Sequence, residues 1–536
     1  MTSLSSIDVQ LTTMNLQSWF DELPTSCKSL GMVGVQQFKP EAIPALRPMS
    51  TNLAIGGWEE FSYTVLEKIG THPILGTGPE LRQRIQDVRK ELLTGAAIEQ
   101  LHYGDEPGLY LCGNQIGLQP RQTSVLLNEY LSIWAAQGMY GLGKKLEDST
   151  LANWGEIDRV AADLMAKVVG GLSYEVSVMG NLTTNLHVLM ASFYKPCHGR
   201  SKIIIERKAF SSDYVGDQQR CFSSCHLALT NLTGGLSLRK YAIQSQIQWH
   251  GLDVAENMVF IDPECDLTLS LSTSTIFSIL ETYASSAALI VLSGVQYLSG
   301  QVLDMEKITS FAHSKGIIVG WDLAHAVGNV ELRLHDWDVD FAVWCNYKYM
   351  NSGPGAIGSI FVHKKYGKVD PSLGMEGYRP RLVGWWGNDI KNRFEMRNSF
   401  APGSGAAGYQ ISNPSVLDTV ALISSLEIFN LTSMFALRQK SVLLTGYLEY
   451  LLGEVPSSQQ FEIITSSNPF ERGAQLSLRF EESVLNAVML RLKEKGIVVA
   501  QKQDVMRVAP VPMYNSFVEV WEFVAELQRA LSACGK

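Results

Sequence analysis

The sequence has few features of a secreted, membrane-bound or organellar protein. Its eight cysteines are scattered over 536 residues, unlike the dense cysteines of a disulfide-stapled secreted domain. No uninterrupted apolar stretch is long enough to cross a bilayer. No lysine or arginine precedes Lys28, whereas secretory and organellar presequences begin with cationic residues. We therefore expect a cytosolic protein with reduced thiols and no membrane partner.

Clusters of positive charge are also scarce. The formal net charge is -9, with acidic and basic residues interspersed, whereas a surface that follows nucleic-acid phosphates needs clustered lysine and arginine. The chain contains no internal repeats and no low-complexity tracts. Its 46% apolar and 18% charged residues are typical of a globular, enzyme-sized subunit. The composition favours a small-molecule substrate and gives no reason to expect nucleic acid as a partner.

The hydrophobic pattern divides the chain into three predicted parts. Residues 1–80 form an N-terminal extension of weak amphipathic segments, to which we assign no function. Over residues 81–400 helices and apolar strands alternate, which is typical of a large α/β domain with a mostly parallel sheet. Residues 401–536 contain two long helices, short strands and a terminal helix. They predict a smaller C-terminal α+β domain.

Three apolar runs in the large domain predict buried strands that each end near a polar residue. These runs are residues 201–206, 287–293 and 316–321. In open α/β sheets, ligands bind outside the carboxyl ends of the strands. The three strands would therefore line up Phe210, Ser293 and Asp322 along one rim of the sheet.

The most informative pair of residues is Asp322 and Lys348. Lys348 follows an apolar, aromatic segment, where burial of its charge is costly, and this favours the neutral amine as a nucleophile. Pyridoxal phosphate needs a lysine for its imine and an acid beside its pyridine nitrogen. A structural alternative is that Asp322 caps a helix and Lys348 extends to the surface. The joint occurrence of both residues with His325 and Tyr347 favours the cofactor site.

Longer motifs then carry a family resemblance. The segments 319–332, 334–337 and 347–351 resemble the signature of the kynureninase family. Further similar motifs lie at 113–114, 117–120, 185–187, 208–210, 293–295, 382–387, 411–414 and 507–512. The resemblance covers roughly residues 105 to 530, and motifs of this length and order are specific.

The resemblance implies a pyridoxal-phosphate (PLP)-dependent transferase-like fold of type I. The implied reaction is hydrolysis of L-kynurenine or 3-hydroxy-L-kynurenine to anthranilate or 3-hydroxyanthranilate and L-alanine. This reaction belongs to tryptophan catabolism and de novo NAD biosynthesis. The implied assembly is a homodimer with shared active sites.

The resemblance also implies a role for each residue of the site. Lys348 would carry the cofactor and act as the base, Asp322 would pair with the ring nitrogen, and Tyr347 would move protons. The other implied cofactor contacts are Leu182, Thr183, Phe210, Ser211, Ser212, Asp213, Ser293 and His325, with Trp385 and Asn413 from a neighbouring subunit. Arg507 would bind the substrate α-carboxylate, with Asn413, Gln115 and Leu142 around the substrate. No metal is expected, because the cysteines and histidine at 221–226 lack a second ligand pair at proper spacing.

Three positions depart from the family motif. Gln115 replaces a serine, Leu142 replaces a histidine, and Ser211 replaces a proline. The first two line the pocket for the aromatic half of the substrate in the resemblance, so they bear on substrate choice rather than on reaction class. An unusual insertion at 214–240 is either a tolerated surface loop or a retained intron in the gene sequence.

Two other functions stay open at the level of sequence. One is a divergent, weakly active or inactive kynureninase paralogue, which the changes at Gln115 and Leu142 motivate. The other is another class V aminotransferase-like PLP enzyme, such as a cysteine desulfurase. A desulfurase needs a cysteine on a mobile loop, whereas Cys345 lies on a predicted buried strand.

Overall fold

A computed structural model describes residues 108–143, 149–197, 199–207, 238–264, 268–395, 398–456 and 460–534. Several of the predicted features lie outside these residues. They are the extension over 1–80, the site residues Phe210, Ser211, Ser212 and Asp213, and positions 214–237 of the insertion.

The large part of the chain is built on a seven-stranded sheet with the order β2-β8-β7-β6-β5-β3-β4. Its strands are β2 (Val176–Val178), β3 (Lys202–Glu206), β4 (Met258–Ile261), β5 (Ala287–Ser293), β6 (Ile318–Asp322), β7 (Phe341–Cys345) and β8 (Gly358–Val362). Strands β4, β3, β5, β6 and β7 are parallel, and β8 runs antiparallel between β7 and β2. The mostly parallel sheet predicted from the sequence is confirmed.

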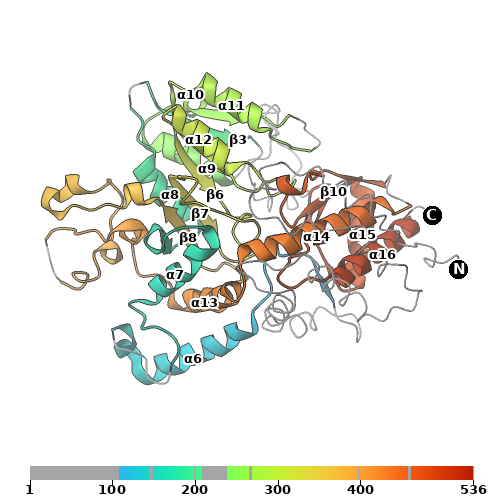
Figure 1. Ribbon diagram of the computed structural model, residues 1–536, viewed down its shortest axis with the longest axis horizontal. Helices are drawn as coiled ribbons and strands as arrows, with labels where there is room; N and C mark the ends of the chain where they lie inside the picture. Colours follow the sequence, from blue (N-terminus) through green and yellow to red (C-terminus); the bar gives the residue numbers. More distant parts are fainter. Residues whose placement is uncertain are drawn as a thin grey trace, which may run out of the picture.

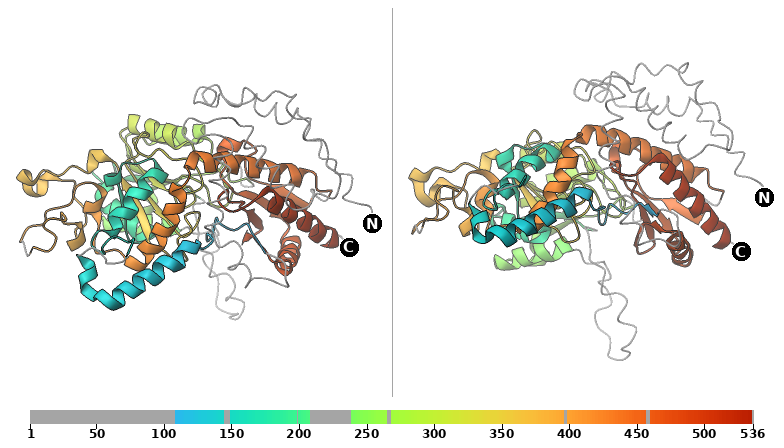
Figure 2. Two further views of the ribbon diagram at one scale, coloured as in Figure 1. Left: turned by 60° about the horizontal axis from the view of Figure 1, so that its bottom comes forward. Right: turned by 90° about the horizontal axis from the view of Figure 1, so that it is seen from below.

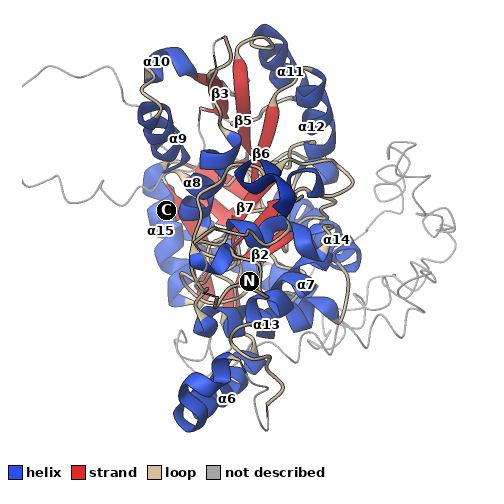
Figure 3. Cartoon of the chain, turned by 90° about the vertical axis from the view of Figure 1, so that its left-hand side faces the viewer, coloured by secondary structure: helices blue, strands red, loops and turns tan. Residues whose placement is uncertain are grey.

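Helices cover both faces of this sheet (Figure 3). One face packs against α8 (Leu182–Phe193) and α9 (Leu238–Trp249). The other packs against α7 (Ile157–Val169), α11 (Thr273–Thr282), α12 (Met305–Ser314) and α13 (Val416–Asn430). Successive residues of a strand point to opposite faces, so in β5 Leu289 and Val291 join the first core while Ile290 and Leu292 join the second. A strand buried on both faces must be apolar throughout, which explains the continuous apolar runs.

The small part lies beside one end of the large part, drawn in orange and red in Figure 1. Its antiparallel sheet has the order β12-β13-β10-β9. These strands are β9 (Phe461–Ile463), β10 (Leu476–Phe480), β12 (Ala500–Lys502) and β13 (Val505–Val508). The helices are α14 (Met434–Gly453), α15 (Glu482–Glu494) and α16 (Phe517–Cys534). These elements share a separate core with the short parallel pair β1 (Leu109–Tyr110) and β11 (Ile497–Val498).

The remaining elements connect or flank the two parts. They are α6 (Arg121–Gln137), α10 (Val254–Asn257), and the 3-10 helices η5 (Gly138–Leu142), η6 (Ser173–Glu175), η8 (Lys364–Tyr366), η9 (Pro371–Gly377), η10 (Trp385–Gly387), η11 (Gly405–Tyr409) and η13 (Pro469–Glu471). Helix α6 runs along the outside of the large part (Figure 2). Among the described residues no single helix has the length and hydropathy of a membrane span; α13 and α14 reach them only as a pair bent by 80°.

Helix α13 packs into the core of the large part, although the sequence places it in the predicted C-terminal domain. Its residues Val420, Leu422 and Leu426 belong to the same cluster as the sheet. The boundary at residue 400 stays a prediction, and the packing of α13 argues for a later one, between Asn430 and Met434.

Candidate active site at the carboxyl ends of the central strands

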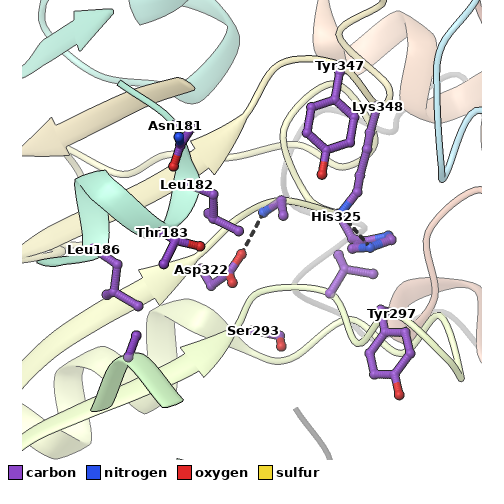
Figure 4. A pocket seen from close by; sticks show the side chains of 13 residues that line it. Asn181, Leu182, Thr183, Leu186, Ser293, Tyr297, Asp322, His325, Tyr347 and Lys348 are labelled. Atoms are coloured by element: carbon purple, nitrogen blue, oxygen red, sulfur yellow. Dashed lines mark hydrogen bonds between the residues drawn. The ribbon is translucent and has the colours of Figure 1, made fainter. Parts of the chain in front are cut away.

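A pocket of about 190 Å³ opens where the central strands end. Its walls come from the segments that follow β2, β5, β6 and β7 (Figure 4). The lining residues are Asn181, Leu182, Thr183, Leu186, Ala242, Ser293, Val295, Tyr297, Asp322, Ala324, His325, Tyr347 and Lys348. Seven of these were predicted as site residues from the sequence, and the fold brings them into one pocket.

Asp322 and Ser293 are neighbours at the rim of the sheet. They are the last residues of β6 and β5 and stand opposite each other in the parallel register. Both are buried, with exposed fractions of 6% and 3%. One carboxylate oxygen of Asp322, Oδ1, accepts the Ala324 N–H at 2.9 Å, and this contact fixes the carboxylate against the pocket wall. The predicted rim is therefore confirmed for these two residues.

Lys348 lies in the turn that follows β7, and its ammonium end meets a histidine. Its Nζ is 2.9 Å from His325 Nε2, shown as a dashed line in Figure 4. The side chain is only 7% exposed, and Nζ lies 5.7 Å from the centre of the Tyr347 ring. The turn is held by the Asn351 N–H, which donates to the Lys348 carbonyl at 3.0 Å. A buried amine with a fixed position and a nitrogen partner suits a nucleophile or a base.

Tyr347 provides a hydroxyl that stays protonated near neutral pH. Burial raises the pKa of this phenol, and the nearby Cys345 and Asp322 act in the same direction. Burial also raises the pKa of the Cys345 thiol, so this cysteine on β7 is unsuited to act as a thiolate nucleophile. The phenol can therefore donate a proton, whereas the thiol has the character of a core residue.

The amino end of α8 forms the wall opposite Lys348. Gly180 adopts a left-handed φ of +50°, where any side chain would approach Asn185 Oδ1 to 2.5 Å. This turn leads to Asn181, whose side chain caps the helix by accepting the Thr184 N–H at 3.1 Å. Leu182 and Thr183 are the first helical residues, so their backbone N–H groups have no intrahelical acceptor. Such a helix start favours an anion such as a phosphate.

Arg507, on β13, approaches the pocket from the small part. It is 2% exposed, and its Nη1 donates to the backbone carbonyl of the pocket residue Tyr297 at 3.2 Å. Its Nε has no hydrogen-bond partner, and among the described residues no carboxylate pairs with it. Burial lowers the pKa of this guanidinium despite the opposing effect of Cys112 and Tyr349. A buried cation without an anion is costly, so an anionic ligand would stabilise it.

Besides Arg507, four of the described residues that were predicted for the site do not line this pocket. Trp385, in η10, is 44% exposed, and Asn413 is exposed. Gln115 is also exposed, and Leu142 is half-buried against the core of the large part. None of these four side chains lines the pocket of its own chain, and the exposed ones are free to contact that of a second copy.

Besides the six lining residues that were not predicted, two supporting residues were not recognised from the sequence. The Glu206 carboxylate, at the end of β3, accepts the hydroxyl of Ser293; an acid ending the run Ile203 to Ile205 was its available signal. Gly117 donates its N–H to the Tyr347 carbonyl at 2.8 Å, and a Cβ there would lie 2.3 Å from the Lys348 carbonyl. Its position in a glycine-containing motif signalled a close backbone approach.

A cluster of Glu175, His335 and His363 lies at the opposite edge of the sheet, where β2 and β7 begin. Three of their ligand atoms lie within 4.8 Å of one another. However, the Glu175 carboxylate already accepts the backbone N–H groups of Leu172 and Lys364 and the His335 Nδ1. The Lys364 ammonium also lies 3.4 Å from His335 Nε2. The nearby cation disfavours binding of a metal ion here. The hydrogen bonds instead make these residues a polar cluster that joins three segments.

The donor set of the pocket fits pyridoxal phosphate. The group needs an amine for covalent attachment, an acid for its ring nitrogen and an anion site for its phosphate. Lys348, Asp322 and the start of α8 supply these three features around one cavity. Two of the three come from adjacent strands and the third from the helix that faces them.

Solved structures with a similar fold belong to the PLP-dependent fold-type I class. The chain aligns with the apo cysteine desulfurase of Thermococcus onnurineus NA1 with a TM-score of 0.61, covering 84% of this chain and 98% of that one. It aligns with a variant of C-DES that carries glycine linked to its PLP cofactor with a TM-score of 0.59, covering 78% and 96%. Both are 14% identical in sequence, so they define the fold of this chain and not its reaction.

Sequence relatives define the family. Kynureninase 1 of Aspergillus oryzae is 49% identical over 84% of this chain and 88% of the relative. Kynureninase 1 of Aspergillus niger is 51% identical over 77% and 84%, and the kynureninase of Coccidioides immitis is 48% identical over 81% and 86%. Residues 437–527 match the kynureninase C-terminal domain. The chain belongs to the kynureninase family.

Proposed function

We propose that this chain hydrolyses L-kynurenine, 3-hydroxy-L-kynurenine or both, with PLP as its cofactor. The products are anthranilate or 3-hydroxyanthranilate and L-alanine. Membership of the kynureninase family supports the reaction. The single structural observation that carries it is the buried pair of Lys348 and His325 beside Asp322 in one pocket.

Each described residue of the pocket has a proposed task in holding the cofactor. Lys348 would attach it, the Asp322 carboxylate would pair with its ring nitrogen, and the N–H groups of Leu182 and Thr183 would bind its phosphate. Ser293 and His325 complete the contacts. When bound, PLP withdraws electrons from the substrate Cα.

The protein residues then carry the proton transfers. The Lys348 amine, held in place by His325, would act as the general base that removes the Cα proton. Water adds to the γ-carbonyl carbon, and the Cβ–Cγ bond breaks to release the aromatic acid. The Tyr347 phenol, which burial keeps protonated, would donate a proton to the Cβ atom left by this cleavage and would regain one from the water that adds.

Arg507 has the properties of the substrate-binding cation. Its planar fork matches a carboxylate, and no described acid competes for it. The α-carboxylate of the substrate would supply the missing anion. This interaction would orient the substrate so that its Cα–H bond lies near Lys348.

The functional form that we propose is a homodimer. Trp385 and Asn413 lie outside the pocket of their own chain, on exposed loops. Other large apolar side chains are exposed on α6 and on the loop around η10, among them Trp134, Leu382 and Phe394. A second copy would bury exposed apolar side chains of this kind. A second copy on this surface would bring Trp385 and Asn413 to the neighbouring pocket.

The alternative functions are not favoured. Similarity to cysteine desulfurases is at 14% identity and concerns the fold alone, and Cys345 is buried on β7. The family relation favours an active kynureninase over an inactive paralogue. Gln115 and Leu142 would act on the choice between kynurenine and its 3-hydroxy form. The cytosolic location stays a prediction.

One experiment tests the assignment directly. The purified protein is supplied with PLP, reduced with borohydride and digested, and the modified peptide is identified by mass spectrometry. We expect the pyridoxyl group on Lys348. In parallel, anthranilate and 3-hydroxyanthranilate release is measured for the native protein and for Lys348→Ala. Folded wild-type protein that leaves Lys348 unmodified, or that releases neither product, would overturn the proposal.

A further inference from the structure

Gln475 joins three segments, one of which carries the pocket residue Tyr297. It directly precedes β10 and is 2% exposed. Its Nε2 donates to the backbone carbonyls of Tyr297 and Leu298, each at 3.1 Å. Its Oε1 accepts the Asn114 Nδ2 at 2.7 Å. One buried amide therefore connects the turn at Asn114, the loop after β5 and the sheet of the small part.

The orientation of this amide is fixed by its partners. The two backbone carbonyls are acceptors, so they require the NH2 end of Gln475. The NH2 group of Asn114 is a donor, so it requires the oxygen end. Rotating the Gln475 amide by half a turn would place its oxygen against two other oxygens. These contacts therefore need both the NH2 group and the oxygen of an amide in this orientation.

The Tyr297 carbonyl has a second donor, which is Arg507. Arg507 Nη1 donates to this carbonyl at 3.2 Å, and on the adjacent strand Arg507 stands opposite Ser477 in the register of β10 and β13. Among the described residues this is the hydrogen bond that holds the guanidinium, whose Nε has no partner. The position of Arg507 therefore depends on the Tyr297 carbonyl, and the position of that carbonyl depends on Gln475.

We propose that Gln475 is a positioning residue for substrate binding, acting through the Tyr297 carbonyl on Arg507. The inference rests on the proposed function, in which Arg507 binds the α-carboxylate. The described contacts of Gln475 do not include Lys348, Asp322 or the start of α8. Loss of Gln475 therefore misplaces the carboxylate-binding fork, and the contacts proposed for the cofactor are unaffected.

The primary test compares Gln475→Met, which keeps the shape and removes the hydrogen bonds, with the wild-type holoenzyme. We expect the KM for L-kynurenine to rise about tenfold, the scale of a lost buried hydrogen-bond pair, with kcat and PLP affinity within about twofold of the wild-type values.

Binding is also measured by cofactor absorbance with L-alanine and with ethylamine, which lacks the carboxylate. L-alanine should bind more weakly and ethylamine should be unaffected, whereas general loosening of the fold would weaken both.

Two further variants make the test specific. Gln475→Glu keeps the acceptor for Asn114 and places an oxygen against the two carbonyls, so its KM should rise at least as much. Gln301→Met is the matched control, because its amide bonds the Leu271 backbone from the same loop and does not contact Tyr297 or Arg507. Its KM should stay within about twofold of the wild type.

A double-mutant cycle with Arg507→Lys decides whether Gln475 acts through the arginine. If it does, introducing Gln475→Met into the Arg507→Lys variant raises the KM by less than about twofold. An unchanged KM in both Gln475 variants, or fully additive effects in the cycle, would overturn the inference. A wild-type enzyme that fails to hydrolyse kynurenine would instead overturn the proposed function, so the two failures are distinguishable.

Discussion

At the scale of single residues, the site includes a buried guanidinium, that of Arg507, whose burial is costly unless an anion completes it. Asp322, Lys348 and Arg507 are all buried, and each makes a hydrogen bond that fixes its side chain. The positions of Asp322 and Lys348 could be predicted from the sequence, because Asp322 ends one apolar strand and Lys348 follows another. The partner of Arg507 could not be predicted from the sequence. Its contact with Tyr297 joins residues 210 positions apart and arises only from the packing of the two parts.

Replacing Asp322 tests the electrostatic part of the site. Asp322→Asn keeps the shape and removes the negative charge that faces the proposed ring nitrogen. We expect kcat to fall by about a hundredfold or more, the scale of a preorganised electrostatic contact, while the protein still folds and binds PLP. Steady-state kinetics on kynurenine measure the change. The exposed Asp163→Asn on α7 is the control, and equal kinetics for Asp322→Asn and the wild type would contradict the role.

At the scale of elements, strands buried on both faces were the most predictable part of the fold. Strand β5 has the predicted bounds, and β3 differs from its prediction by one residue. The predicted strand from residue 316 was wrong at its start, because Gly316 adopts a φ of +68° and ends the preceding helix α12. The true strand begins at Ile318 and continues to Asp322. A local pattern shows where an apolar run lies but not which turn precedes it.

The turn that carries Lys348 depends on close packing against Gly117. Gly117→Ala would place a Cβ 2.3 Å from the Lys348 carbonyl and 2.1 Å from Asn351 Oδ1. Overpacking of this kind costs about 1–3 kcal/mol, so we expect a lower Tm and weaker PLP binding, measured by thermal unfolding and by titration of the apo protein. Gly143→Ala is the control, since its added Cβ meets no atom within 4 Å. Equal behaviour of the two variants would refute the close packing.

Asp340 holds the start of β7 to its neighbours and makes stability depend on pH. It accepts His313 Nε2 at 2.8 Å, the Val319 N–H at 2.7 Å and the Tyr366 hydroxyl at 2.8 Å. Burial alone would raise the pKa of this carboxyl, but His313 and Lys365 outweigh it, so its pKa lies below the usual value. The stabilisation is therefore present above the unfolded pKa of an aspartate, about 3.9, and is lost as pH falls through the lower folded value.

The variant Asp340→Asn should therefore be destabilised most at neutral pH. We expect a cost of about 3 kcal/mol at pH 7, the scale of a broken buried ion pair, seen as a lower Tm. The difference from the wild type should narrow as the pH approaches the folded pKa of Asp340. The exposed Asp336→Asn should match the wild type throughout. A Tm difference that is constant with pH would show that charge is not the cause.

At the scale of the whole molecule, the described chain forms only part of the proposed site. The family resemblance places Trp385 and Asn413 with the cofactor, yet both lie outside the pocket of their own chain and on exposed surface. Sequence motifs identify such residues but do not show which copy they serve, because contact between chains leaves no local pattern. In the proposed dimer, a second copy would resolve this separation without any change in the fold of either chain.

Complementation between two inactive variants tests this arrangement. Lys348→Ala lacks the base, and Asn413→Ala lacks the residue that we propose to act across the interface. If Asn413 acts in trans, a mixed dimer has one site with both residues intact and one site with neither. Random pairing of co-expressed chains would then restore about a quarter of the wild-type activity, whereas each variant alone stays inactive. Size-exclusion chromatography with light scattering measures the dimer. Dimers without restored activity would place Asn413 in the site of its own chain.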